Sequence, residues 1–142
     1  MKNELVVIDT NILVSALITQ NGYSKKIFDD LILTGKIKMC LSGPVFEEYE
    51  GVLNRQKFRK FPSFQKNAID LMNQLKENGV WFDPKTPVKV LSDEDDDKFI
   101  ELAMEAKAAF LVTGNINDFT FTTFEGVAIC SPREYYERFI VL

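Results

Sequence analysis

The chain has 142 residues, of which 46% are hydrophobic and 27% charged, a composition typical of a soluble globular protein that predicts one domain over residues 1–142. It contains no histidine, which excludes Ser-His-Asp and Cys-His catalytic systems and histidine-rich zinc sites. Its net charge of −4 means that any binding of nucleic acid must depend on a local basic patch or a bridging metal ion.

Apolar strand patterns alternate with helical patterns in the first half of the chain. The run LVVI stops at Asp9 and predicts a buried strand, and NILVSALI after it predicts a buried helix or turn. The segment GYSKKIFDDLILTGK predicts a helix with Ser24 as its N-cap. KIKMCLS predicts a second strand, and two helices follow it, one beginning near Pro44 and one near Ser63.

The second half of the chain opens with the acidic run of residues 93–97, which leads into the helical pattern DKFIELAMEAK. AAFLVTG and GVAIC predict two more strands, and PREYYERF predicts a closing helix. The four clearest strands are almost purely apolar, as strands are when both faces of a sheet are covered. The sequence therefore predicts an α/β fold with a mainly parallel sheet between two layers of helices.

Acidic residues follow the strands of this predicted sheet, where ligands bind in open parallel sheets. Asp9 directly follows the first strand, and Asp118 lies four residues beyond AFLVTG. Asp96 and Asp97 open the helix that leads into that strand, and Glu48 lies on the helix after the second strand. Carboxylate oxygens suit a hard divalent cation, so the pattern points to a metal site that gathers acids from distant parts of the chain.

Each of these acids also has a purely structural explanation that the sequence alone leaves open. Asp9 can cap the next helix with help from Thr10 and Asn11, and Asp118 can form an Asx-turn. Glu48 can belong to an exposed helix face, and the acidic run of residues 93–97 can favour the positive end of its helix.

A basic segment, NRQKFRKF, lies at residues 54–61 and is either a grip for phosphate groups or a solvated helix end. Its basic side chains are Arg55, Lys57, Arg59 and Lys60. Elsewhere, Cys40 and Cys130 each end a short apolar run, which predicts buried free thiols.

Taken in order, these motifs resemble the PIN-domain family over roughly residues 4–140. VVIDTNILVSAL resembles the opening strand with its first acid, Asp9, and SGPVFEEYEGVL resembles the helix with the second, Glu48. DEDDDKFIELAMEAKAAFLVTGNINDF resembles the helix of the third acid, its strand and the loop of the fourth acid. The family pattern Asp-x-x-Ile-x-x-Ala selects Asp97, with Asp96 as the neighbour that shares the role.

The fourth acid departs from the commonest family pattern. Many relatives carry Thr-Gly-Asp where this chain has Thr113, Gly114 and Asn115, and a family variant has an acid three residues later, before Phe. The resemblance therefore assigns the fourth acid to Asp118. Asn115 is neutral and can bind a metal ion only through a weaker carbonyl oxygen.

The resemblance implies a three-layer α/β/α fold and an Mg²⁺- or Mn²⁺-dependent endoribonuclease, the toxin of a toxin–antitoxin pair. The start of the chain lacks the pattern of a secretory signal, so we expect it to be cytoplasmic. The implied partners are an RNA substrate, a cognate antitoxin protein and a second copy of the chain. The implied catalytic residues are Asp9, Glu48, Asp97 and Asp118. Those implied to hold metal are Asp9, Asp97, Asp118 and Asp96. Those expected to orient the carboxylates are Asn11, Thr113 and Asn115.

Two other classes of protein remain open at this point. An α/β phosphatase or phosphoacceptor domain also sets acids at strand ends, but the expected Asp-x-Asp is replaced here by Asp9, Thr10 and Asn11, and LVTGN lacks the expected lysine. A PIN-fold module that binds RNA or protein without catalysis is supported by the neutral Asn115. No apolar run approaches the ~18–20 residues of a membrane span, and the start of the chain does not resemble a secretory signal, so we expect no membrane partner.

Overall fold

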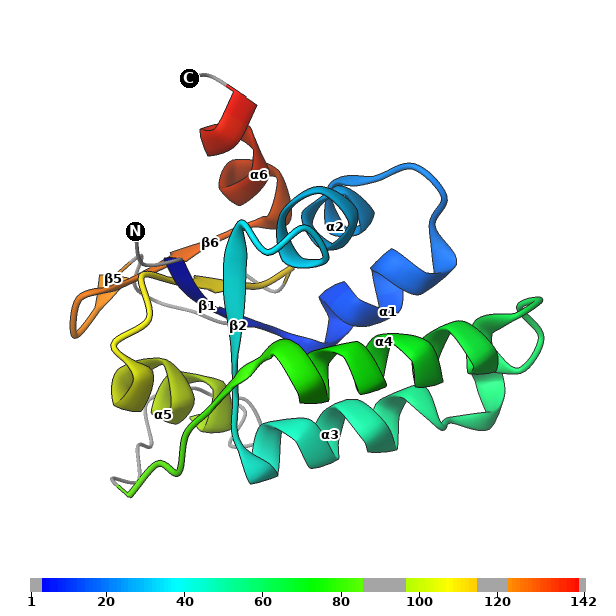
Figure 1. Ribbon diagram of the computed structural model, residues 1–142, viewed down its shortest axis with the longest axis horizontal. Coiled ribbons are helices and arrows are strands. Elements are labelled where there is room, and N and C mark those ends of the chain that lie inside the picture. The colour runs from blue at the N-terminus through cyan, green and yellow to red at the C-terminus, as the bar shows by residue number, and fades with distance from the viewer. Residues whose placement is uncertain (1–3, 86–96, 115–122, 141–142) are drawn as a thin grey trace.

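The computed structural model describes residues 4–85, 97–114 and 123–140, and its described strands form one six-stranded sheet (Figure 1). The strands are β1 (Glu4–Ile8), β2 (Ile37–Leu41), β3 (Val80–Trp81), β4 (Phe110–Val112), β5 (Thr123–Phe124) and β6 (Val127–Cys130). They lie in the order β3-β2-β1-β4-β6-β5, and every neighbouring pair is parallel except β5 and β6. The mainly parallel sheet that the sequence predicts is confirmed.

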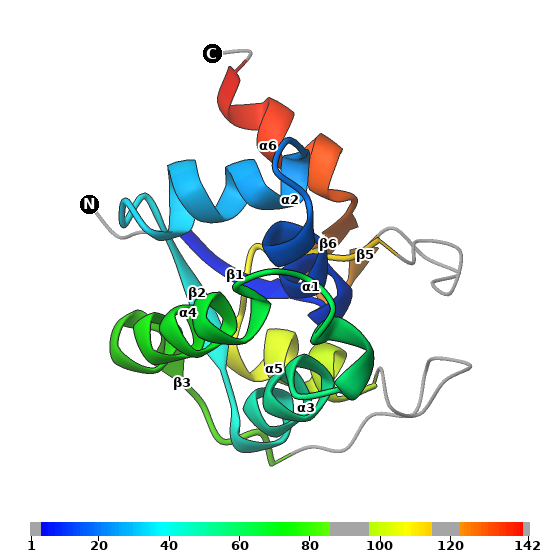
Figure 2. The same ribbon diagram turned by 90° about the vertical axis from the view of Figure 1, so that its right-hand side faces the viewer.

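Helices cover both faces of this sheet. They are α1 (Thr10–Ile18), α2 (Tyr23–Lys26), α3 (Gly43–Leu53), α4 (Phe64–Asn78), α5 (Asp97–Ala106) and α6 (Pro132–Ile140), with a π-helical segment η1 (Ile27–Ile32) and a 3₁₀ turn η2 (Gln56–Phe58). The helix α5 packs across β1, β2 and β4, and both η1 and α4 pack against β2. Figure 2 shows α5 on one side of β1 and β2, with α2 and α6 on the other. The architecture is the predicted three-layer α/β/α arrangement.

A local sequence signal explains where α3 begins. Ser42 caps α3, because its hydroxyl oxygen accepts a hydrogen bond from the backbone N–H of Val45 at 3.3 Å. The predicted cap at Ser24 is wrong, since Gly22 is the N-cap and Ser24 lies inside α2. The backbone of α2 then continues into η1 without a break.

The core is continuous from the sheet into both helical layers. The last three residues of β1 are completely buried, as are Tyr49 of α3 and Leu102 of α5. Cys40 and Cys130 are free and buried, as the apolar runs that they end predict. Burial of the thiols raises the pKa of each from 9.0 to about 12.

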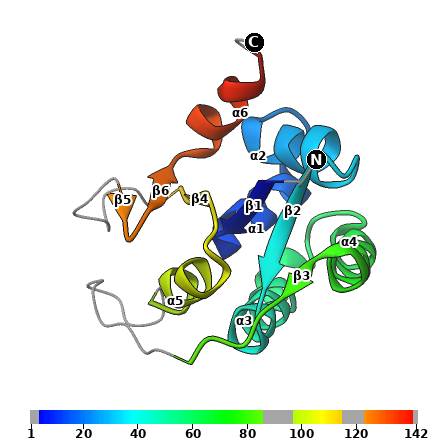
Figure 3. The ribbon, with the colours of Figure 1, turned by 60° about the vertical axis from the view of Figure 1, so that its left-hand side comes forward.

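The register of the parallel strands brings their carboxyl ends to one edge of the sheet. Ile8 of β1 is opposite Val112 of β4, and Val112 is opposite Cys130 of β6. The pairing continues one step further, because the N–H of Asp9 donates to the carbonyl of Val112 at 2.9 Å. The N–H of Thr113 likewise donates to the carbonyl of Cys130 at 2.9 Å. Asp9 and Thr113 are therefore fixed side by side. Figure 3 shows the strands that carry them, β1 and β4, next to each other in the sheet.

Within the three described ranges, no helix combines the length and the apolar character that crossing a membrane requires. The organisation of residues 1–142 as one domain stays a prediction.

Candidate functional site

Asp9 is a buried carboxylate at the carboxyl end of β1. It is 7% exposed and precedes α1 as its N-cap residue, yet its side chain makes no capping hydrogen bond. Instead, Oδ2 of Asp9 accepts a hydrogen bond from the Thr113 hydroxyl at 2.8 Å, and Thr113 is fully buried. Asp9 therefore precedes the helix as its N-cap residue while its side chain is tied to Thr113.

The surroundings of Asp9 disfavour its negative charge. Burial raises the pKa of its carboxyl above 3.8, and the nearby negative charge of Glu48 raises it further. The Thr113 hydroxyl and the backbone N–H groups of Thr10 and Asn11 lower the pKa, but they do not cancel the effect of burial. A cation beside Asp9 would favour the charged form.

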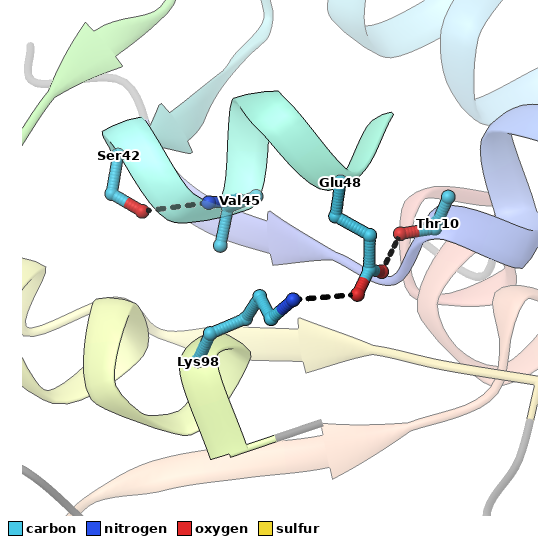
Figure 4. A network of polar contacts seen from close by, with 5 residues as sticks. All are labelled: Thr10, Ser42, Val45, Glu48 and Lys98. Carbon is cyan, nitrogen blue, oxygen red and sulfur yellow. Dashed lines mark hydrogen bonds and ion pairs between the residues drawn. The ribbon is translucent and has the colours of Figure 1, made fainter. Parts of the chain in front are cut away.

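Glu48 joins this region from α3. One of its carboxylate oxygens, Oε2, accepts a hydrogen bond from the hydroxyl of Thr10, the first residue of α1. The other, Oε1, lies 2.9 Å from Nζ of Lys98 (Figure 4). Because one partner belongs to α1 and the other to α5, both carboxylate oxygens are held in place by separate elements.

Tyr49 of α3 contacts the end of β1 next to Asp9. Its hydroxyl donates to the carbonyl of Ile8 at 2.5 Å, just before Asp9. Burial and the charges of Asp9 and Glu48 raise the pKa of Tyr49 well above 10, so the phenol stays a neutral donor. The sequence predicts Tyr49 only as part of the apolar stripe of its helix. Its position next to Glu48 is the one sequence signal that its hydroxyl reaches the carboxyl end of β1.

Asp97 begins α5 and is buried, with 4% exposure. The ion pair from Lys98 to Glu48 connects this first turn of α5 to α3. Within residues 4–85, 97–114 and 123–140, however, no three His, Cys, Asp or Glu residues are grouped so that they could hold a metal ion. Three further predicted residues, Asp96, Asn115 and Asp118, lie outside the described residues.

Two other predicted residues lie near the site. Thr113 donates to Asp9, and its role in orienting the carboxylate stays a prediction. Asn11 is exposed, and the part of the chain that the structure describes shows no hydrogen bond from its side chain to a carboxylate. The described donor set is nevertheless made of oxygen atoms, which are the ligands that Mg²⁺ and Mn²⁺ prefer.

The basic segment follows α3 and folds around η2. Phe58 is buried and stacks on Phe64 with ring centroids 4.9 Å apart, so it anchors the segment to α4. All of the predicted phosphate-binding side chains are exposed, namely Arg55, Lys57, Arg59 and Lys60. Among the described residues, no carboxylate forms an ion pair with any of them. Their charges are available to an anionic partner.

A pocket of about 570 Å³ lies away from these acids. It is lined by the C-terminal end of α1, parts of α2, η1 and α4, and the segment after η2. None of Asp9, Glu48 and Asp97 contributes to its wall. The candidate site is therefore the acid-lined edge of the sheet.

Comparison with known proteins gives matches of sequence and of fold. The sequence model of the PIN domain matches residues 5–117. The uncharacterized protein MJ1680 of Methanocaldococcus jannaschii is 37% identical over 110 residues, which are 78% of this chain and 70% of that protein.

Two solved structures share the fold. The crystal structure of VapBC2 from Rickettsia felis bound to a DNA fragment from their promoter contains a chain with a TM-score of 0.58 and 15% identity, and the match covers 89% of this chain and 98% of that one. The structure of FitAB bound to an IR36 DNA fragment gives a TM-score of 0.58 and 17% identity, covering 89% and 94% of the two chains. At these identities the likeness is one of fold.

Proposed function

Because this chain belongs to the PIN domain family, we propose that it is a metal-dependent endoribonuclease that hydrolyses phosphodiester bonds of RNA. The observation that carries the proposal is the buried Asp9 at the carboxyl end of β1. Its carboxylate is tied to Thr113 and lies close enough to Glu48 for the two charges to repel. Buried negative groups that repel one another are stabilised when a cation binds between them.

The proposed metal ligands are Asp9, Asp97 and Asp118, with Asp96 as a neighbour that shares the role. A bound Mg²⁺ or Mn²⁺ ion would supply an activated water molecule and neutralise charge on the phosphate. Thr113 holds the Asp9 carboxylate in one orientation, and such neighbouring hydrogen bonds tune the affinity of carboxylate ligands. Glu48, held by Thr10 and Lys98, is proposed to orient a water molecule of the metal ion or to complete a second metal site.

The basic segment is proposed to bind the RNA on either side of the cleaved bond. Its four exposed cations form a local positive patch on a chain whose net charge of −4 does not attract RNA. Phe58 and Phe61 hold the segment against α4, since their ring centroids lie 4.9 and 6.5 Å from that of Phe64. Lys57 lies over the ring of Phe58 and Lys60 over that of Phe61, at 5.2 and 5.5 Å from the centroids.

We also propose that the chain is the toxin of a toxin–antitoxin pair, works in the cytoplasm and forms a homodimer. The support is the fold shared with chains of VapBC2 and FitAB, both of which are solved as complexes bound to DNA. A cognate antitoxin protein is the partner that this proposal requires. A co-purification of the chain with the product of a neighbouring gene would test it.

One alternative keeps the fold but not the catalysis. Asn115 stands where many relatives carry an acid, so the chain can be a module that binds RNA or protein without cutting it. The phosphatase and phosphoacceptor alternatives are not retained, because the family match over residues 5–117 is to the PIN domain.

The decisive experiment incubates single-stranded RNA with the protein and Mn²⁺, with and without EDTA, and repeats it with Asp9→Asn. We expect cleavage that EDTA abolishes and that Asp9→Asn reduces by about a hundredfold or more, since metal and ligand are both required. The matched control is Asp70→Asn, the same change on an exposed position of α4, which should cleave as the wild type does.

Thermal melting gives a second readout that does not need cleavage. An ion that binds only the folded state stabilises it by about 2.7 kcal/mol at a hundredfold excess over its Kd. Mn²⁺ should therefore raise the Tm of the wild type and of Asp70→Asn but not that of Asp9→Asn. Cleavage that persists in EDTA, or full activity of Asp9→Asn, contradicts the proposal, and RNA binding without cleavage supports the inactive module.

A further inference from the structure

Lys98 is a cation that forms an ion pair with Glu48, one of the acids of the candidate site. It is the second residue of α5, directly after Asp97, and its Nζ lies 2.9 Å from Oε1 of Glu48. The two side chains are 25% and 19% exposed, so the pair is partly buried but can be reached from solvent. Figure 4 shows Lys98 and Thr10 approaching the carboxylate of Glu48 from different elements.

Helix stability alone does not explain a lysine at this position. The first turn of a helix carries a partial positive charge, which disfavours a cation there. A partly buried ion pair adds little net stability, because the cost of removing both charges from water offsets much of their attraction, so the bond to Glu48 is a weak reason to hold a lysine in this turn. Residues that break a local rule of this kind are often functional.

The chemistry of the ammonium group suits a phosphate. A lysine has three N–H donors, and Glu48 is its hydrogen-bond partner among the described residues, which leaves donors for another anion. The carboxylates of Asp9, Glu48 and Asp97 would repel a phosphodiester that approached without a cation. The ion pair with Glu48 keeps Nζ at the site while no substrate is bound.

We propose that Lys98 contacts a phosphate of the bound RNA strand and is a substrate-binding residue of the site, distinct from the proposed metal ligands. The inference rests on the proposed ribonuclease function for the identity of its substrate. Glu48 then has a positioning role, since it holds the ammonium group next to the place where the strand passes.

The test measures RNA binding without metal, so that it does not depend on cleavage. A fluorescein-labelled single-stranded oligouridylate is titrated in EDTA at a series of NaCl concentrations, and its anisotropy gives the Kd. The variants are Lys98→Gln, which keeps a donor for Glu48, Lys98→Met, which keeps the apolar stem, and Lys98→Arg, which keeps the charge. The matched control is Lys107→Gln, an exposed lysine just beyond the other end of α5.

Loss of one phosphate contact to a single strand lowers the slope of log affinity against log salt by about 0.7, which corresponds to roughly an eightfold weaker Kd near 50 mM salt. We expect this change for Lys98→Gln and Lys98→Met, while Lys98→Arg and Lys107→Gln keep the wild-type slope. A purely structural role for Lys98 would lower the Tm without changing the slope. Circular dichroism establishes that each variant is folded.

The outcomes separate this inference from the proposed function. If the wild type cleaves RNA with Mn²⁺ but the folded Lys98 variants bind the oligonucleotide with the wild-type slope, the inference is wrong and the ribonuclease stands. If the Lys98 variants show the lowered salt slope but the wild type does not cleave RNA, the phosphate contact is supported and the nuclease proposal is wrong. A wild type without measurable affinity in EDTA also overturns the inference.

Discussion

Replacement of Thr113 by valine should destabilise the metal-free protein by about 1.5–3 kcal/mol at neutral pH, the usual contribution of a hydrogen bond to a charged group. Valine has nearly the shape of threonine but lacks the hydroxyl that donates to Oδ2 of Asp9 at 2.8 Å. Both side chains are buried, at 0% and 7% exposure, so water cannot easily replace the lost donor. The pKa of Asp9 should also rise further, because the Thr113 hydroxyl lowers it.

Urea unfolding followed by circular dichroism in EDTA measures this free energy. The same substitution is made in an Asp9→Ala background, where the carboxylate is absent and the hydroxyl has lost that acceptor. There, Thr113→Val should change the free energy of unfolding by less than about 1 kcal/mol, because the interaction energy belongs to the pair. A loss below about 0.5 kcal/mol in the wild-type background, or an equal loss in both backgrounds, would refute the reasoning.

Further predictions concern two glycines and the two buried thiols. Gly79→Ala would put a Cβ atom 2.7 Å from the carbonyl oxygen of Leu75, so urea unfolding should show a loss of about 1–3 kcal/mol. Gly51→Ala, on α3 with no heavy atom within 4 Å of the new Cβ, should instead add about 0.5–1 kcal/mol. Since burial raises the pKa of Cys40 and Cys130 from 9.0 to about 12, both thiols should react with Ellman's reagent at pH 8 only after unfolding. The stability that their neutral forms contribute should be complete below pH 9 and disappear as the pH rises towards 12, and rapid loss of structure at pH 9 in urea-free buffer would contradict this.

The main elements of the fold could be predicted because their apolar patterns are long enough to show a period. β5 could not, because two residues carry no alternation and the strand exists only through its pairing with β6. The turn between them, at Glu125 and Gly126, has φ values of 50° and 85°, as a tight hairpin turn requires. The sequence there lacks the Asn-Gly or Asp-Gly pair that usually announces such a turn.

Site residues could be predicted only where neighbouring residues in the sequence mark them. Asp9 is recognisable because a charged residue directly follows a buried strand, and the family resemblance supplies Thr113 as its neighbour. The contact between Lys98 and Glu48 joins residues 50 positions apart, and the bond from Tyr49 to Ile8 joins residues 41 apart. No periodicity or capping rule links such pairs, since their proximity follows from how the helices pack.

The two outermost strands of the sheet, β3 and β5, have only two residues each. A folded copy therefore presents few free backbone N–H and C=O groups along these strands to which another chain could add by β-augmentation. Cross-β aggregation at these margins would require prior unfolding.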